Sequence, residues 1–184
     1  ANEMLEQRVQ KRTSELERVN AQLSESLELS RKYELAKQTI HTMANFDPLT
    51  GLSNKRAFTD WFNERVLNIN NDGRSYLTLC FDINSLKKIN NAMGYKAGDK
   101  IIVRVSEMLK ELLGSEDFLC RLDGDSFILH IDNSFESFDE AELLAIEIHD
   151  ALHRKTSKPF FIQGSLVDFS VSIGAMVYKE VNFT

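Results

Sequence analysis

The chain of 184 residues has few of the residues that interrupt helices or cross-link chains: two prolines, two cysteines and eight glycines. It also lacks a run of about 18 apolar residues, so we expect no membrane span. Its first residues contain no hydrophobic signal core. Cys80 and Cys120 each lie within an apolar run, which predicts buried free thiols rather than a disulfide and favours a cytoplasmic location.

Positive charge is also scarce, because 22 Lys and Arg residues stand against 28 Asp and Glu residues and give a net charge of −6. This balance gives no general affinity for nucleic acid or for an anionic membrane, so we expect neither as a partner. An acidic protein that binds a polyphosphate is expected to need a bridging cation. The apolar fraction of 42% is large enough for a packed core.

Residues 1–45 contain neither Gly nor Pro and predict one long helix. Apolar residues recur there at alternating steps of four and three, as Leu5, Val9, Leu16, Val19 and Leu23 (with Arg12 in the series), and then as Leu29, Tyr33, Ala36, Ile40 and Met43. This pattern predicts a coiled coil and a parallel homodimer through residues 1–45. A three-residue insertion offsets the two seams, which suits a helix that transmits a signal. A plain dimerisation helix is the alternative.

Residues 46–184 are expected to form one domain. The helix should stop before Asp47, because Pro48 disfavours helical backbone at the preceding residue. Gly51 permits a tight reversal, and Ser53 or Asn54 is a candidate cap for the next helix. The further order of predicted elements is strand, two helices, hairpin, helix and strands. This order indicates an α+β fold in which helices flank a small mixed sheet.

The apolar run 76–81 predicts a strand buried on both faces, and Asp82 follows at its carboxyl end. A carboxylate there can hold a cation, while the first N–H groups of the following helix face phosphates. Lys87 can neutralise phosphate charge, and the Asn90 carboxamide can pair with a base edge. The alternative is that polar residues and a glycine of this segment only cap helices: Asp82, Asn84, Gly94 and Asp99.

Residues 118–129 place an Asp-Gly pair between two apolar runs, which predicts a tight β-hairpin. A type I′ turn needs positive φ at both central positions, and Asp123-Gly124 accepts this at low strain. Asp123 and Asp125 give the hairpin two carboxylates. The tip can therefore hold a divalent metal or admit a nucleotide close to its backbone. An ordinary surface hairpin is the alternative.

Three segments, in the right order, resemble the GGDEF family of diguanylate cyclase domains. Residues 47–56 resemble the family's opening Asp-Pro-Leu-Thr-Gly-Leu-x-Asn-(Lys/Arg)-Arg. Residues 82–99 resemble its Asp-x-Asp-x-Phe-Lys-x-(Ile/Val)-Asn-Asp-x-x-Gly-His-x-x-Gly-Asp segment, and residues 123–127 resemble a degenerate Gly-Gly-(Asp/Glu)-Glu-Phe signature. The resemblance covers about three quarters of the chain. It implies a palm-like, ferredoxin-like α+β domain of cyclic di-GMP signalling.

The resemblance also implies roles for the matching residues. The metal, Mg²⁺ or Mn²⁺, is implied to bind Asp82, the Ile83 carbonyl and Asp125, and Asp125 is the catalytic carboxylate if the domain is active. GTP is implied to bind Lys87, Asn90, Asp99 and Gly124. In the family's reaction, two domains face each other, each with one GTP, and the two nucleotides condense into cyclic di-GMP.

Several positions depart from the family pattern. Ser126 replaces the second hairpin carboxylate, which should weaken metal binding and reduce catalysis by orders of magnitude. Asp123 replaces a glycine, so its charge either repels phosphate or supplies a replacement ligand. Gly114 stands where the family's product-inhibition motif has its Arg. We therefore expect a catalytically impaired regulatory and dimerising module that still binds GTP. The alternatives are an active diguanylate cyclase and a purely structural dimerisation module.

The resemblance also bears on the extent of the domain. Family members carry a later helix with Lys and Arg residues that bind the phosphates, and the sequence ends at Thr184 before such a helix. We therefore expect residues 46–184 to be a C-terminally incomplete domain and the natural protein to continue, with an EAL-type phosphodiesterase domain as a candidate. A place in the cytoplasmic part of a membrane-attached sensor is compatible with this expectation.

Overall fold

The computed structural model describes residues 2–68 and 75–179, and it describes side chains for all of these except residues 65–68, 75, 132–134 and 179. The chain divides into two compact units, Ala1–Met43 and Ala44–Thr184, and each is described by itself. In the described parts of the chain, no helix is long and apolar enough to cross a membrane.

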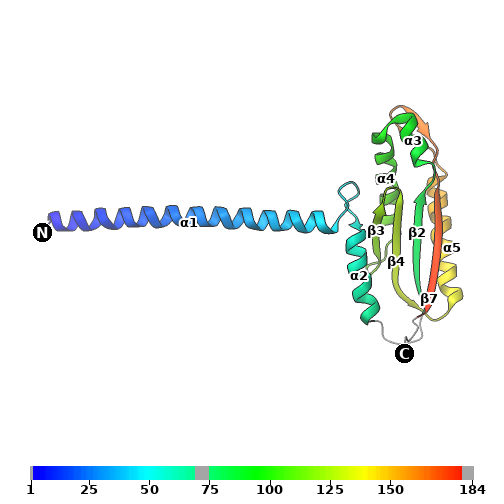
Figure 1. The fold of residues 1–184 in the computed structure, drawn as a ribbon, viewed down its shortest axis with the longest axis horizontal. Helices are drawn as coiled ribbons and strands as arrows, with labels where there is room; N and C mark the ends of the chain where they lie inside the picture. The colour runs from blue at the N-terminus through cyan, green and yellow to red at the C-terminus, as the bar shows by residue number, and fades with distance from the viewer. Residues whose placement is uncertain (1, 69–74, 180–184) are drawn as a thin grey trace. The chain divides into compact units, whose positions relative to one another are not determined.

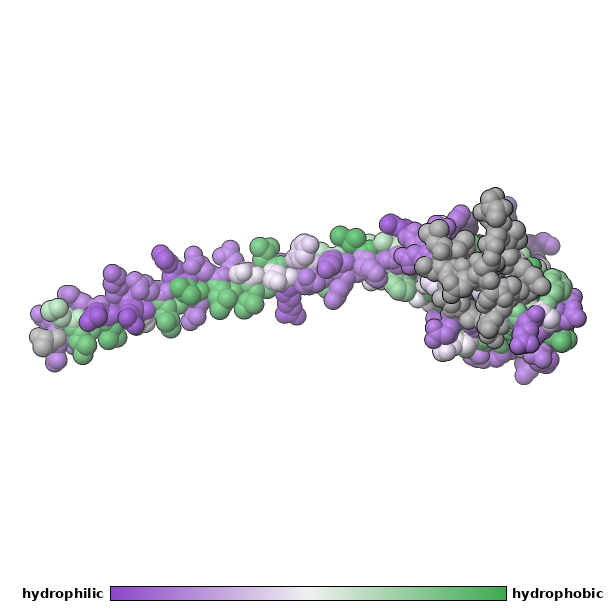
Figure 2. All heavy atoms as spheres, turned by 90° about the horizontal axis from the view of Figure 1, so that it is seen from below, coloured by the Kyte–Doolittle hydropathy of each residue, from purple (hydrophilic) through white to green (hydrophobic). Residues whose placement is uncertain are grey.

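The first unit contains α1 (Asn2–Asn45) as far as Met43, and α1 continues as a single helix to the predicted end. None of its described residues is buried within the chain. The apolar residues of the predicted seams are exposed, with 66% of Leu16, 56% of Val19 and 56% of Leu23 accessible. Figure 2 shows these green apolar residues among purple polar ones along the helix. The predicted long helix is therefore confirmed, and its apolar side chains are left exposed by the part of the chain that the structure describes.

The second unit is built on a five-stranded mixed sheet in the order β1-β3-β4-β2-β7 (Figure 1). The strands are β1 (Ser53–Asn54), β2 (Ser75–Ile83), β3 (Phe118–Asp123), β4 (Ser126–Phe135) and β7 (Val171–Lys179). The helices are α2 (Lys55–Asn68), α3 (Leu86–Met93), α4 (Tyr95–Lys110) and α5 (Phe138–Thr156). A separate hairpin joins β5 (Phe160–Ile162) to β6 (Ser165–Val167). The α+β prediction is confirmed.

The core lies between one face of this sheet and the helices α3, α4 and α5. Alternate residues of the central strands enter it: Leu77, Leu79, Phe81 and Ile83 from β2, and Phe127, Leu129 and Ile131 from β4. The two-residue period of a strand places these side chains on a single face. The helices contribute fully buried residues such as Ile101 and Leu152. The antiparallel pairing of β2 with β4 thereby places the carboxyl end of β2 beside the amino end of β4.

The opposite face of the sheet is covered only in part. Trp61 of α2 stacks on Phe118 at a ring distance of 4.6 Å and meets the buried His130 at 5.1 Å. Cys80 also points to this face, between Ile128 and Gly174 in the neighbouring strands, and it is exposed. The prediction that this strand is buried on both faces is therefore wrong for Cys80, and so is the prediction that both thiols are buried.

The junction before the sheet follows the sequence prediction. Gly51 has a φ of +67°, which serves the predicted reversal. The Asn54 side chain accepts a hydrogen bond from the Ala57 amide at 3.0 Å and thereby caps α2. The same side chain donates to the Ala44 carbonyl at 2.9 Å, a contact within the second unit.

Candidate functional site

The hairpin between β3 and β4 turns one residue later than predicted. Asp123 pairs with Ser126, so Gly124 and Asp125 are the central residues of the turn. Only Gly124 has positive φ, at +45°, which is the pattern of a type II′ turn rather than the predicted type I′. The cause is a register shift between Arg121 and Asp123, which places an extra residue in β3. The tip presents the Asp125 carboxylate beside an unsubstituted backbone at Gly124.

Asp82 and Ser126 lie directly opposite each other where β2 and β4 pair. The Ser126 hydroxyl donates a hydrogen bond to Oδ2 of Asp82 at 3.0 Å. One residue on, the Ile83 amide donates to the Asp125 carbonyl at 3.1 Å. The strand register therefore brings together the residues that the sequence proposed for a metal site, and it adds Ser126 as a direct partner of Asp82.

These residues are a poor fit to a stably held magnesium ion. Mg²⁺ favours oxygen ligands with carboxylate charge in near-octahedral geometry. The Ser126 hydroxyl is neutral, and its proton engages a lone pair of Oδ2 of Asp82. Within the described residues, no group of three or more His, Cys, Asp and Glu side chains is arranged to hold a metal. Among the described residues, Asp82, Asp123 and Asp125 are the carboxylates that β2 and the hairpin bring to this end of the sheet.

The turn from β2 to α3 is held by β7 and by the residue that precedes this strand. Asn84 donates from Nδ2 to Oγ of Ser170, and its Oδ1 accepts from Ser172 Oγ, both at 3.0 Å. The residue at the helix start is Ser85, with a φ of +63° and no side-chain cap bond. The interpretation that Asp82 or Asn84 caps this helix is therefore wrong. Lys87 lies exposed on the first turn of α3.

Asn90 and Asp99 come from α3 and α4, which meet at Gly94 with a φ of +83°. Because α4 begins at Tyr95, Asp99 lies within the helix, and the interpretation of Asp99 as its cap is wrong. A Cβ on Gly98 would lie 2.0 Å from Oδ1 of Asn90, so the absence of a side chain there admits the carboxamide. Among the described residues, this buried Oδ1 has no hydrogen-bond partner.

Asp99 also borders a cavity of about 400 Å³ on α4. Its apolar walls are Leu49, Val103 and Phe160, and its charged lining residues besides Asp99 are Lys100, Arg104 and Glu107. Sequence reasoning missed the apolar walls, because they come from the loop before β1, from α4 and from the start of β5. The cavity offers apolar contact beside charged side chains of both signs.

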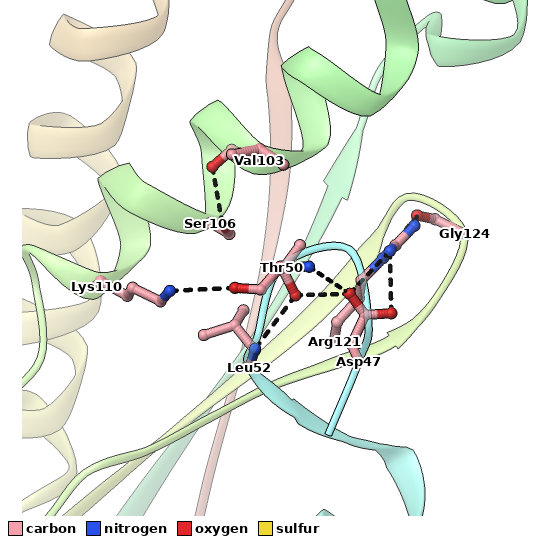
Figure 3. A network of polar contacts seen from close by, with 8 residues as sticks. All are labelled: Asp47, Thr50, Leu52, Val103, Ser106, Lys110, Arg121 and Gly124. Atoms are coloured by element: carbon pink, nitrogen blue, oxygen red, sulfur yellow. Dashed lines mark hydrogen bonds and ion pairs between the residues drawn. The ribbon is translucent and has the colours of Figure 1, made fainter. Parts of the chain in front are cut away.

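An ion pair joins the hairpin to the loop at residues 47–52 (Figure 3). Nη1 of Arg121 donates to both carboxylate oxygens of Asp47 at 3.0 and 3.1 Å. Nη2 and Nε of the same side chain donate to the Gly124 carbonyl at 2.6 and 3.1 Å. The Thr50 amide and hydroxyl also donate to Asp47, at 2.8 and 2.7 Å. Sequence reasoning missed this role of Arg121, although a lone Arg in an apolar strand two residues before the turn was an available signal.

These contacts determine the protonation of Asp47. Burial alone would raise the pKa of this carboxyl, but the hydrogen bonds from Thr50 and the hydrogen bond and charge of Arg121 outweigh it. The pKa of Asp47 is therefore lower than its ordinary value. The ionised carboxylate fixes the Arg121 guanidinium, which in turn holds the Gly124 carbonyl of the turn.

A sequence profile described as "Diguanylate cyclase, GGDEF domain" matches residues 44–183. Cyclic di-GMP phosphodiesterase NbdA of Pseudomonas aeruginosa is 29% identical over 95% of this chain and 21% of its own length. Protein y4lL of Sinorhizobium fredii is 36% identical over 76% of this chain and 16% of its own length. Signaling protein YkoW of Bacillus subtilis is 34% identical over 82% of this chain and 18% of its own length. The chain thus spans about a fifth of these relatives.

Solved structures show the same fold. The coiled coil and GGDEF domain of DgcB from Caulobacter crescentus, in complex with c-di-GMP, has a TM-score of 0.73 at 21% identity, over 88% of this chain and 83% of that one. A sensory box/GGDEF family protein from Caulobacter crescentus CB15 has a TM-score of 0.64 at 26% identity, over 73% of this chain and 84% of that one.

Proposed function

The chain belongs to the GGDEF family, and on that premise we propose that residues 46–184 form a catalytically impaired GGDEF domain that binds a guanine nucleotide and regulates cyclic di-GMP signalling. The observation that carries this proposal is Ser126, which lies opposite Asp82 and donates a hydrogen bond to its carboxylate. The family signature has a carboxylate at this position, so the chain has exchanged an anionic ligand for a neutral donor.

This exchange acts on the step that the family catalyses. Condensation of two GTP molecules needs in-line positioning and neutralisation of phosphate charge by metal ions. Ser126 brings no negative charge to a metal, and Asp123 adds a charge at the hairpin where the signature has glycine. Loss of one preorganised electrostatic group lowers a rate by about 100- to 1,000-fold in other enzymes. We expect a reduction of at least this size here.

Nucleotide binding is supported by the residues where α3 and α4 meet. Among the residues that the structure describes, Oδ1 of Asn90 is buried without a hydrogen-bond partner, Gly98 makes room for it, and Asp99 borders the cavity on α4. A buried acceptor without a donor is costly unless a ligand or water supplies one. This observation favours a ligand-binding domain over a purely structural dimerisation module.

The dimeric arrangement and the output are further parts of the proposal. The exposed seams of α1 suit a parallel homodimer through residues 1–45. Relatives of this chain include a phosphodiesterase, NbdA, and a bifunctional diguanylate cyclase/cyclic di-GMP phosphodiesterase, MucR. By analogy, the domain regulates a phosphodiesterase (EAL-type) domain of the same polypeptide. We also propose a cytoplasmic location, where GTP is available to the domain.

The test compares the chain with a variant that restores the signature, Asp123→Gly with Ser126→Glu. Both are incubated with GTP and either Mg²⁺ or Mn²⁺, cyclic di-GMP is quantified by chromatography, and GTP binding is measured by calorimetry. We expect GTP binding by the unaltered chain and, in the restored variant, product formation at least about 100-fold faster. Comparable product from the unaltered chain, abolished by Asp125→Ala, would establish an active diguanylate cyclase instead. Absence of GTP binding would leave the structural alternative.

A further inference from the structure

Two histidines share one exposed face of α5. His149 and His153 are four residues apart, so their side chains lie one above the other on adjacent turns of the helix. Their ring centroids are 6.0 Å apart, and the two ring planes are inclined by only 4°. Both side chains are exposed, with 55% of the His149 side chain accessible. Small rotations about the side-chain bonds can therefore direct one nitrogen of each ring at a shared cation, about 2 Å from each.

Asp150 determines which nitrogen of His149 is available for a metal. Its Oδ1 lies 3.0 Å from Nδ1 of His149. A neutral His149 that donates this hydrogen bond carries its proton on Nδ1 and keeps the lone pair of Nε2 free for a cation. Histidine ligands in metal sites commonly donate their second N–H to a carboxylate, which fixes the ring orientation and makes the ligand nitrogen more basic. This contact therefore indicates a metal ligand rather than an ordinary polar surface.

The backbone that carries the two histidines is firmly anchored. α5 runs along the sheet and packs on β2 and β7 (Figure 1). Ile148 and Leu152, which directly precede the two histidines, are only 6% and 1% exposed. At the first turn, the Ser137 hydroxyl accepts a hydrogen bond from the Glu140 amide at 3.1 Å. The helix thus sets the spacing of the rings before a metal binds, so binding needs to order only two side chains.

We propose that His149 and His153 form a surface chelate for a first-row transition metal ion, with Asp150 as the positioning residue of His149. Imidazole nitrogen suits Cu²⁺, Ni²⁺ and Zn²⁺, whereas Mg²⁺ favours oxygen ligands. The site has two protein ligands, since no group of three or more His, Cys, Asp and Glu in the described residues is arranged to hold a metal. Water completes the coordination.

This site consists of α5 residues only and is independent of the proposed nucleotide binding. A metal held by both rings joins two adjacent turns of the helix. It binds the folded chain and not the unfolded one, in which the spacing of the rings is lost, so it stabilises the domain in proportion to the logarithm of the metal concentration above the dissociation constant. The stability of the domain then depends on the supply of such an ion.

Calorimetric titration of the full chain with Cu²⁺, Ni²⁺, Zn²⁺ and Mg²⁺ tests this proposal. All samples carry Cys80→Ser, so that the exposed thiol neither binds nor reduces the metal. We expect one transition metal ion per chain, bound most tightly for Cu²⁺, and no heat from Mg²⁺ that depends on the histidines. Absence of saturable binding of all three transition metals up to about 1 mM would overturn the proposal. Half an ion per chain would also overturn it, because the ligands would then come from two chains.

Substitution of each histidine locates the site. His149→Gln and His153→Gln should each weaken metal binding by about tenfold or more and remove the rise in Tm that the metal causes. His41→Gln is the matched control, because it replaces an exposed histidine on α1 and should keep full affinity. The Tm without metal should agree among the three variants. Metal binding that survives both α5 substitutions would place the metal elsewhere and contradict the proposal.

Asp150→Ala tests the positioning role. It removes the acceptor beside His149 Nδ1 and leaves both proposed ligands in place, so we expect metal affinity to fall by about tenfold. Nitrogen-15 NMR of the metal-free chain should show the Nδ1–H tautomer of His149 in the unaltered chain and a mixture of tautomers in Asp150→Ala. Asp150→Asn should restore the single tautomer, because its carboxamide oxygen still accepts from Nδ1. An unchanged tautomer in Asp150→Ala would contradict this role.

Discussion

At the scale of single residues, Asp47 links the loop before β1 to the hairpin through Thr50 and Arg121. Only 17% of its side chain and 11% of the Arg121 side chain are exposed, so water replaces these contacts poorly. We expect Asp47→Asn to lower the free energy of unfolding at pH 7 by about 1–3 kcal/mol. Urea denaturation measures this. Asp60→Asn is the control, since its ion pair with Arg56 is exposed, and it should change stability by less than about 0.5 kcal/mol.

The same carboxyl gives a pH dependence with a definite sign. Its pKa in the folded chain lies below its ordinary value, so the folded state binds this proton less tightly than the unfolded state. The stabilisation is complete above the ordinary pKa, about 4, and is lost as pH falls through the lower folded value. The difference in stability between the unaltered chain and Asp47→Asn should therefore shrink below about pH 4. A difference that stays constant from pH 7 to pH 2.5 would contradict this assignment.

The two thiols should differ in reactivity. Burial raises the pKa of the Cys120 thiol to about 12, whereas Cys80 is exposed on the open face of the sheet. The thiolate is the reactive species, so Cys120 should be protected twice, by low ionisation and by inaccessibility. We expect Ellman's reagent to modify one thiol rapidly in the native chain and two after denaturation. Cys80→Ser should remove the rapid reaction, and a rapid reaction that survives this substitution would show that Cys120 is accessible.

At the scale of elements, α1 is a helix of 44 residues without buried residues among those described. Helices in proteins gain their stability mainly from the packing of an apolar face. Because the apolar seams of α1 are exposed, they predict association of two copies. Leu16→Glu should weaken self-association at least tenfold, because it places a charge in the centre of the first seam. Ser14→Glu lies off the seam and serves as the control. Sedimentation equilibrium measures both, and equal dimerisation of the two variants would exclude this seam.

Elements whose signal is local could be predicted from the sequence. The end of α1 at Asn45 follows from Pro48, and the cap of α2 follows from Asn54. The turn type could not be predicted, because the register shift after Arg121 depends on pairing with β4. The exposure of Cys80 could not be predicted either, since its run is apolar apart from Thr78 and only the partial cover by α2 leaves that side chain open.

The candidate site likewise has features that local sequence predicts and features that it does not. Spacing after a strand was enough to select Asp82, Asn90 and Asp99 as site residues. The hydrogen bond between Ser126 and Asp82 required the strand register. The walls of the cavity, Leu49 and Phe160, are separated by more than a hundred residues, and no local pattern connects them. Contacts of this kind become visible only when distant segments are packed together.

At the scale of the whole molecule, we expect self-association and nucleotide binding to belong to different units of the chain. Every residue of the core cluster lies within Ala44–Thr184, as do all the candidate site residues. We therefore expect a chain reduced to residues 44–184 to unfold in one cooperative transition and to bind guanine nucleotide with the affinity of the full chain, but to lose self-association. Calorimetry and sedimentation measure these properties, with the full-length Leu16→Glu variant as the matched control. Nucleotide affinity that falls more than tenfold on truncation, but not in Leu16→Glu, would show that α1 contributes to the site by itself. An equal fall in both would show instead that the nucleotide site needs the dimer, because association is the property that the two changes share.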